Sequence, residues 1–164
     1  MRKRDTRHLG RDRRADAADR VRTRAQGAAA PEASARYRIT IAEDDEKFLL
    51  LLQYFIAQAF PHAGIDTFPN AEDALGHILN TGTDILITDD RMAAMSGTDL
   101  IRELRSRGLT IPIVMVSGNL EGQPGALLAG ATEFLDKSVS FTGIADRLRQ
   151  LLPARSGCAS SLGQ

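Results

Sequence analysis

Residues 83–97 read TDILITDDRMAAMSG and contain a strand signal followed by a loop that closes at Gly97. The apolar run at 85–88 ends abruptly on two acidic residues, Asp89 and Asp90. A short run of this kind is typical of a buried strand in a parallel sheet, and it would deliver a carboxylate to the carboxyl end of that strand. Acidic residues also cap strands where they meet solvent, so a functional role for Asp89 depends on what the other strands carry.

Four further strand-like runs flank this one, and patterns with helical spacing separate them. The predicted strands are 37–42, 64–68, 85–88, 111–116 and 131–135. The predicted helices are 47–60, 71–79, 98–107, a weak patch at 126–129 that follows two glycines and a proline, and 140–152. Helical spacing places Leu51 and Leu79 on core-facing sides, and Asn70 is predicted to cap the second helix. The alternation predicts an α/β fold with a doubly wound five-stranded parallel sheet and helices on both faces.

Polar residues follow the predicted strands at their carboxyl ends, which lie along one edge of a parallel sheet. These residues are Glu43, Asp44, Asp89, Ser117 and Lys137. Ligands of doubly wound folds bind at this edge, in the crevice where the strand order reverses. The pattern therefore predicts one site that combines three carboxylates, a hydroxyl group and an ammonium group.

Three neighbouring carboxylates repel one another unless a cation joins them. Mg²⁺ suits such a site because it accepts one or two carboxylates and keeps its other positions for water and phosphate oxygens. Asp89 is then predicted to act as a nucleophile toward a phosphoryl group, with Lys137 and Ser117 holding the transferred oxygens. The neighbouring acids Asp45 and Asp90 are expected to be solvated and not to bind the metal.

This set of residues resembles the response-regulator receiver domain of two-component signalling over residues 37–152. The positions that match the family's motifs are the acidic metal-binding pair Glu43 and Asp44, the phosphoacceptor Asp89 with Met92, Met95 and Gly97, the hydroxyl residue Ser117, the aromatic residue Phe134 and the lysine Lys137. The resemblance implies the flavodoxin-like strand order 2-1-3-4-5. It also implies that the acidic pair, Asp89 and the backbone carbonyl of Arg91 bind Mg²⁺, and that Ser117 and Phe134 form a switch.

A receiver of this kind takes a phosphoryl group from a histidine kinase or a histidine phosphotransfer protein, hydrolyses it slowly and signals through contact with another protein. The implied function is that of a phosphoacceptor in a phosphorelay, and not that of an enzyme that turns over an external substrate. No motif names the kinase or the downstream partner. An aspartyl phosphatase on a similar sheet would need an additional acid beside Asp89 as proton donor, and neither Asp90 nor Arg91 suits that role.

Two positions depart from the family's pattern. Ala93 stands where a proline usually follows the first methionine, and Ser138 stands where the family has a proline in a cis peptide bond. A cis bond without proline costs about 2.5 to 4 kcal/mol, so the bond between Lys137 and Ser138 is predicted to be trans. Both departures favour an alternative function, a degenerate receiver that is not phosphorylated and serves as a docking module, whereas the intact acidic set argues against it. Affinity for Mg²⁺ separates the two hypotheses.

The two ends of the chain differ in composition from the predicted domain. Residues 1–36 carry 11 Lys or Arg against 5 Asp or Glu, with only two sizeable aliphatic residues, which predicts a disordered arginine-rich extension. Nucleic-acid binding by this arm is disfavoured because acidic residues dilute its charge and no aromatic residue is available to stack on a base. Residues 153–164 predict a flexible tail whose single cysteine, Cys158, excludes a disulfide framework. No apolar run approaches the roughly 18 residues of a membrane helix, and the expected location is cytoplasmic.

Overall fold

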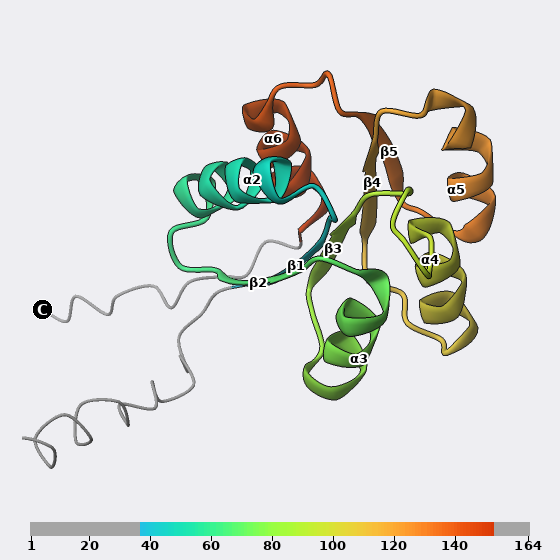
Figure 1. Cartoon of the computed structure of the whole chain (residues 1–164). Coiled ribbons are helices and arrows are strands. Elements are labelled where there is room, and N and C mark those ends of the chain that lie inside the picture. Colours follow the sequence, from blue (N-terminus) through green and yellow to red (C-terminus); the bar gives the residue numbers. More distant parts are fainter. Residues whose placement is uncertain (1–36, 153–164) are drawn as a thin grey trace, which may run out of the picture. The chain divides into compact units, whose positions relative to one another are not determined.

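The computed structural model describes residues 37–152, which form a five-stranded parallel sheet with helices on both of its faces (Figure 1). The strands are β1 (Arg38–Ala42), β2 (Gly64–Phe68), β3 (Ile85–Thr88), β4 (Ile113–Ser117) and β5 (Glu133–Asp136). Their order in the sheet is β2-β1-β3-β4-β5, and every neighbouring pair is parallel. The predicted doubly wound fold and its strand order are confirmed. The extension and the tail predicted at 1–36 and 153–164 lie outside the described residues.

Within residues 37–152, four helices connect the strands and a fifth follows β5, and all but one of the five begin at a polar residue that caps them. They are α2 (Glu46–Ala59), α3 (Ala71–Thr81), α4 (Gly97–Ser106), α5 (Gln123–Ala129), which follows a short 3-10 turn η1 (Leu120–Gly122), and α6 (Phe141–Leu151). Side chains of Asp45, Asn70, Ser96 and Ser140 accept hydrogen bonds from backbone N–H groups in the first turns of α2, α3, α4 and α6. The predicted cap at Asn70 is therefore confirmed. Within residues 37–152, no helix combines the length and apolar character that would let it cross a bilayer.

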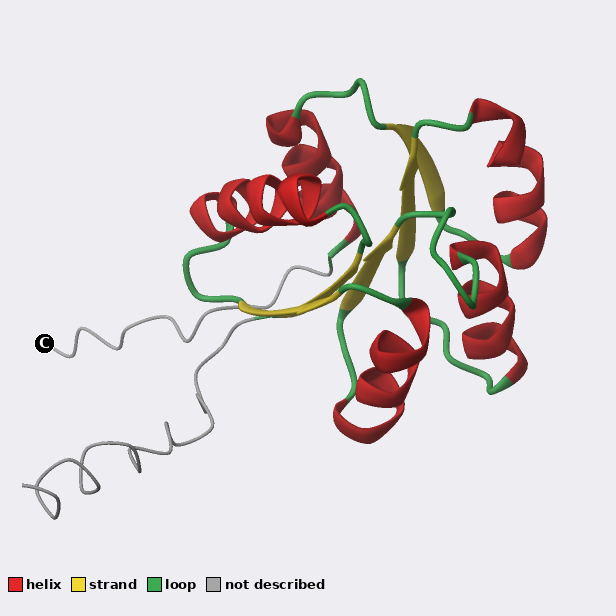
Figure 2. Ribbon diagram, viewed as in Figure 1, coloured by secondary structure: helices red, strands yellow, loops and turns green. Residues whose placement is uncertain are grey.

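The sheet separates two apolar clusters, because α2 and α6 cover one of its faces and α3, α4 and α5 cover the other (Figure 2). Strand β3 is buried on both sides: Ile85 and Ile87 pack under α2 and α6, and Leu86 packs under the other three helices. The predicted inward orientation of Leu51 and Leu79 is wrong, because these side chains are 49% and 41% exposed. In each case the adjacent residue on the helix takes the core position.

Several element boundaries differ from the prediction, as at β5, which begins at Glu133 and not at residue 131, and two of the differences lie next to a proline. Strand β4 begins at Ile113 and not at residue 111, since Pro112 has no N–H to donate and contributes only its carbonyl, which accepts from Leu86 N at 3.1 Å. Helix α5 begins at Gln123, earlier than the weak patch predicted at 126–129. Pro124 lies in the first turn of α5, where helical N–H groups have no partner within the helix, so its missing donor costs little.

Arg105, near the end of α4, joins three segments at the amino ends of β4 and β5. Its guanidinium donates hydrogen bonds to the carbonyls of Leu109, Ile111 and Gly130 at 2.8, 2.9 and 3.0 Å. Gly130 ends α5 with a φ of 104°, and a Cβ there would lie 2.9 Å from Arg105 Cγ. The position therefore requires glycine both for its backbone conformation and for the room that the arginine side chain takes.

Candidate functional site

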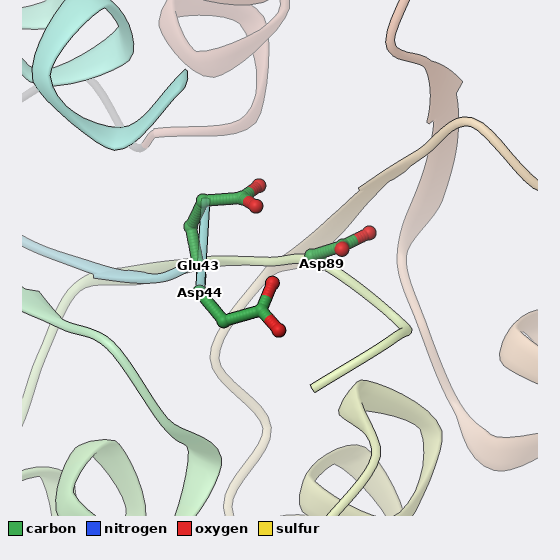
Figure 3. Close-up of side chains that lie close together, drawn as sticks. All are labelled: Glu43, Asp44 and Asp89. Carbon is green, nitrogen blue, oxygen red and sulfur yellow. The ribbon is translucent and has the colours of Figure 1, made fainter. Parts of the chain in front are cut away.

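Three acidic side chains, from residues directly after β1 and β3, gather at the carboxyl edge of the sheet (Figure 3). Hydrogen bonds to neighbouring strands hold the backbone of two of these residues in place. Glu43 N donates to the Phe68 carbonyl at 3.0 Å, and Asp89 N donates to the Ala42 carbonyl at 2.9 Å. Glu43, Asp44 and Asp89 can each offer one carboxylate oxygen such that all three oxygens lie within 4.8 Å of one another. The convergence predicted from the strand ends is thus present for these three residues.

The site is largely withdrawn from solvent. Glu43 is 2% exposed and Asp89 is 6% exposed, whereas Asp44 lies at the open side. Oxygen Oδ1 of Asp89 is buried and has no hydrogen-bond partner among the described residues. Buried like charges and an unsatisfied carboxylate oxygen are unfavourable by themselves. A divalent cation with a preference for oxygen ligands would relieve both, so the donor set fits Mg²⁺.

Lys137 reaches this cluster from the end of β5. Its Nζ lies 2.9 Å from the carboxylate of Glu43 and 3.2 Å from Asp89 Oδ2. Residues 37–152 contain no cis peptide bond, so the bond between Lys137 and Ser138 is trans as predicted. The ammonium group nevertheless enters the site and pairs with two of its three carboxylates.

Burial and charge act against each other on the two partners of this ion pair. For Glu43, burial has the largest effect and raises the carboxyl pKa above its ordinary value, while Lys137 and the N–H of Asp45 lower it and the charge of Asp89 raises it further. For Lys137, burial is again the largest single effect and lowers the pKa. Its hydrogen bond to Glu43 and the charges of Asp89 and Glu43 together outweigh burial and raise the pKa of Lys137 above 10.5.

This raised pKa predicts a loss of stability at alkaline pH. The native state holds the Lys137 proton more tightly than the unfolded chain, so the stabilisation is fully present below the ordinary pKa of 10.5 and is lost as the pH rises through the higher folded value. Urea unfolding in EDTA from about pH 8 to about pH 11.5 measures it. Lys137→Met should show a smaller alkaline decline than the native chain, and an identical decline would contradict the pairing.

The other predicted site residues lie near this edge in different environments. Ser117 ends β4 and is 1% exposed; its Oγ accepts from Asn119 N at 3.2 Å, and its carbonyl accepts from Lys137 N at 3.2 Å. Phe134 lies on β5 opposite Met115 and is half-buried against the cluster under α3, α4 and α5. Arg91 is exposed in the loop between β3 and α4. The roles expected for these three residues stay predictions.

Of the two acids expected to be solvated and not to bind the metal, Asp45 is exposed as predicted and Asp90 is half-buried, and both make structural contacts. Asp45 caps α2. Asp90 Oδ1 accepts from Thr98 N at 3.2 Å and from Thr98 Oγ1 at 2.7 Å, which joins the loop after β3 to the first turn of α4. Neither residue belongs to the cluster that could hold a metal. A threonine eight residues after an acid carries no recognisable pattern, so this contact could not be predicted from the sequence.

Phe48 is a neighbour of the site that the sequence did not indicate as such. Helical spacing marks it only as an apolar residue of α2, but the centre of its ring lies 4.6 Å from Lys137 Nζ. The available signal is its place one turn after the acidic pair, which puts the side chain at the amino end of α2, beside the site. This signal does not show that a lysine from β5 would reach the ring.

The model of the response regulator receiver domain family matches residues 39–149. The two-component response regulator PhoP of Pseudomonas aeruginosa is 33% identical over 128 residues, which cover 76% of this chain and 55% of that protein. The transcriptional regulatory protein PcoR of Escherichia coli is 32% identical over 126 residues, with 75% and 55% covered. The chain therefore belongs to the response regulator receiver domain family of two-component systems. It spans about half the length of these curated relatives.

Solved structures show the same fold. The response regulator TrrA of Thermotoga maritima, crystallised in complex with Mg²⁺ and BeF, is 25% identical, has a TM-score of 0.65, and is matched over 71% of this chain and 99% of that one. A CheY-like receiver domain protein of Methanospirillum hungatei is 23% identical with a TM-score of 0.64, over 70% and 91% of the two chains.

Proposed function

We propose that this chain is an active phosphoacceptor, and that Asp89 receives the phosphoryl group from a phosphohistidine on a histidine kinase or a phosphotransfer protein. The observation that carries the proposal is the state of the Asp89 carboxylate. It is almost fully buried, one oxygen lies 3.2 Å from the Lys137 ammonium, and the other has no hydrogen-bond partner among the described residues. A carboxylate in this state is well placed to be a nucleophile.

The transfer is a balanced exchange of one bond at phosphorus. The P–N bond of the phosphohistidine breaks and leaves its electron pair on the imidazole nitrogen, while an oxygen of Asp89 forms the new P–O bond. Negative charge develops on the phosphoryl oxygens during this step, and catalysis consists mainly of positioning and of neutralising that charge. The ammonium of Lys137 and the hydroxyl of Ser117 are the protein groups proposed to meet these oxygens. Slow attack of water on phosphorus later releases inorganic phosphate and restores the carboxylate.

The metal-binding groups are proposed to be Glu43, Asp44, Asp89 and the backbone carbonyl of Arg91. When bound, Mg²⁺ would neutralise the crowded carboxylates and the oxygens of the incoming phosphoryl group. The acidic cluster supports this assignment for the three carboxylates, and the solved relative in complex with Mg²⁺ and BeF belongs to the same family. The carbonyl of Arg91 is carried over from the family's motif alone.

Signalling is proposed to follow from a rearrangement at the ends of β4 and β5. Phosphorylated Asp89 would draw in Ser117, whose hydroxyl accepts a hydrogen bond from Asn119 N in the present state, and Phe134 would move in the space this opens. The changed surface would then be read by a downstream protein in the cytoplasm. A role in transcription belongs to the longer relatives and is not proposed for this chain.

The decisive test is intact mass spectrometry after incubation of the native chain with acetyl phosphate. We expect a gain of one phosphoryl mass with Mg²⁺ and none with EDTA, since the unscreened carboxylates repel an anionic donor. Titration calorimetry with Mg²⁺ should show one binding event that Glu43→Gln weakens. A folded chain that binds Mg²⁺ without ever gaining mass, from acetyl phosphate or from a kinase, would contradict the proposal, and a chain that does not bind Mg²⁺ either would be a docking module.

A further inference from the structure

The ammonium group of Lys137 contacts an aromatic ring in addition to the carboxylates of the site. Lys137 comes from the last turn of chain before α6, without the proline that usually follows this lysine, and its side chain is 24% exposed. A lysine side chain has a flexible stem of four carbons and loses considerable conformational entropy when it is fixed in one position. Ion pairs with Glu43 and Asp89 fix Nζ from one direction. A second contact that limits its motion would pre-organise the group.

The ring of Phe48 makes this second contact. Its centroid lies 4.6 Å from Lys137 Nζ, which is within the range of an attractive cation–π interaction. The ring face is electron-rich, so it attracts the ammonium without competing as a hydrogen-bond acceptor. Phe48 therefore holds the Lys137 ammonium in place and leaves the N–H groups of Lys137 available to carboxylate or phosphoryl oxygens.

Phe48 is itself fixed by a row of aromatic rings between α2 and α6. Its ring lies 5.2 Å from that of Phe141 at an angle of 48°, and Phe141 stacks on Phe55 at 5.2 Å with their planes 7° apart. Phe48 and Phe141 are both half-buried against the cluster under α2 and α6. The row gives Phe48 a defined orientation, so that the face of its ring stays toward Lys137.

We propose that Phe48 is a positioning residue for phosphoryl transfer, whose ring holds the Lys137 ammonium in the site in a chain that has Ser138 where a proline would otherwise shape the approach. The inference rests on the proposed function for its effect on rate, but the contact itself does not. The proposed role of Phe48 is exerted through Lys137 and not through contact with the donor or the acceptor.

A spectroscopic signature tests the contact without any phosphorylation. The chain contains three lysines, so a ¹H–¹³C spectrum of lysine-labelled protein has few side-chain signals. Lys137→Arg assigns the Lys137 signal, and the ring current of Phe48 should shift its Hε protons upfield of the other two lysines. Phe48→Leu should abolish this shift. The matched control is Phe55→Leu, which removes the ring at the other end of the row but keeps the direct contact of Phe141 with Phe48, so the shift should stay in place.

The effect on rate is tested with the electron density of the ring as the only variable. Replacing Phe48 site-specifically by mono-, di- and trifluorophenylalanine withdraws charge from the ring face with little change in shape, so the rate of mass gain from acetyl phosphate should fall step by step. Phe48→Leu should lower it about threefold to tenfold, in keeping with one partly exposed cation–π contact. Phe48→Tyr, which keeps the ring face, should restore most of the rate.

Each negative outcome points to a different error. An unshifted Lys137 signal in the native chain would overturn the contact itself. A shifted signal with equal rates in the native chain, the fluorinated series and Phe48→Leu would overturn the positioning role, as would an equal loss of rate in Phe55→Leu. Failure of the native chain to gain a phosphoryl group at all would contradict the proposed function and with it the effect on rate, while the Lys137 signal would still decide the contact.

Discussion

Asp89→Asn is expected to abolish the gain of phosphoryl mass from acetyl phosphate while leaving the chain folded. An amide oxygen is a far weaker nucleophile than a carboxylate, so the new P–O bond cannot form. The shape of the side chain is nearly unchanged, and its oxygen can still accept from Lys137, which now lies 3.2 Å away. Removing one of three like charges from a largely buried cluster should also raise the stability of the metal-free chain slightly. Mass spectrometry and urea unfolding of the same preparation measure both effects.

The control for this variant is the neighbouring acid. Asp90→Asn removes a carboxylate one residue away but keeps an oxygen that accepts from Thr98, so it preserves the contact with α4. It should still be phosphorylated. If Asp89→Asn gained the phosphoryl group and Asp90→Asn lost it, the assignment of the acceptor would be wrong by one residue. If both variants gained it, the acceptor would lie outside this pair.

Gly97→Ala is expected to lower the free energy of unfolding by about 3 kcal/mol, at the upper end of the usual effect of overpacking. Gly97 opens α4 directly against the end of β3. A Cβ at this position would lie 1.9 Å from the Asp89 carbonyl oxygen, 2.9 Å from the carbonyl carbon and 3.0 Å from Thr88 Oγ1. Two of these atoms belong to the backbone of Asp89, directly after β3, which cannot rotate away as a flexible side chain could. Urea unfolding with an unchanged m value would measure the loss.

Gly76→Ala supplies the matched control because it makes the same chemical change in the interior of α3. No atom lies within 4 Å of the Cβ that would be added there. Alanine in a helix interior is favoured over glycine, so this variant should gain about 0.5 to 1 kcal/mol. A similar result for the two variants, in either direction, would show that the close approach of Gly97 to Asp89 does not determine stability.

The fold and the edge of the site could be predicted because both follow from local patterns. Strands buried on both faces give continuous apolar runs, as at 85–88, and parallel strands bring their carboxyl ends to one edge whatever the loops do. The convergence of Glu43, Asp44 and Asp89 could therefore be predicted from their positions after the strands. The match of Ser117 and Lys137 to a known pattern added the identity of the family.

The details that could not be predicted depend on contacts between distant segments. Leu51 and Leu79 have helical spacing that suits burial, as do their neighbours Leu52 and Ile78. Packing decides which side of a helix faces the sheet, and of these residues Leu52 and Ile78 are buried. The contact of Phe48 with Lys137 joins residues from α2 and the end of β5. No periodicity in one segment contains information about such a pair.

Arg105 fixes one end of this half of the sheet, the end opposite the site. Its single guanidinium ties α4 to the connections that lead into β4 and β5, through Leu109, Ile111 and Gly130. The opposite ends of the same two strands carry Ser117 and Lys137. A displacement that begins at Ser117 and Lys137 would therefore act on strands whose opposite ends are held by Arg105. We expect β4 and β5 to bend about that held end and not to slide along their length. We expect the amplitude of such a motion to grow with distance from Arg105 and to be greatest at Ser117 and Lys137, where the proposed phosphoryl transfer would take place.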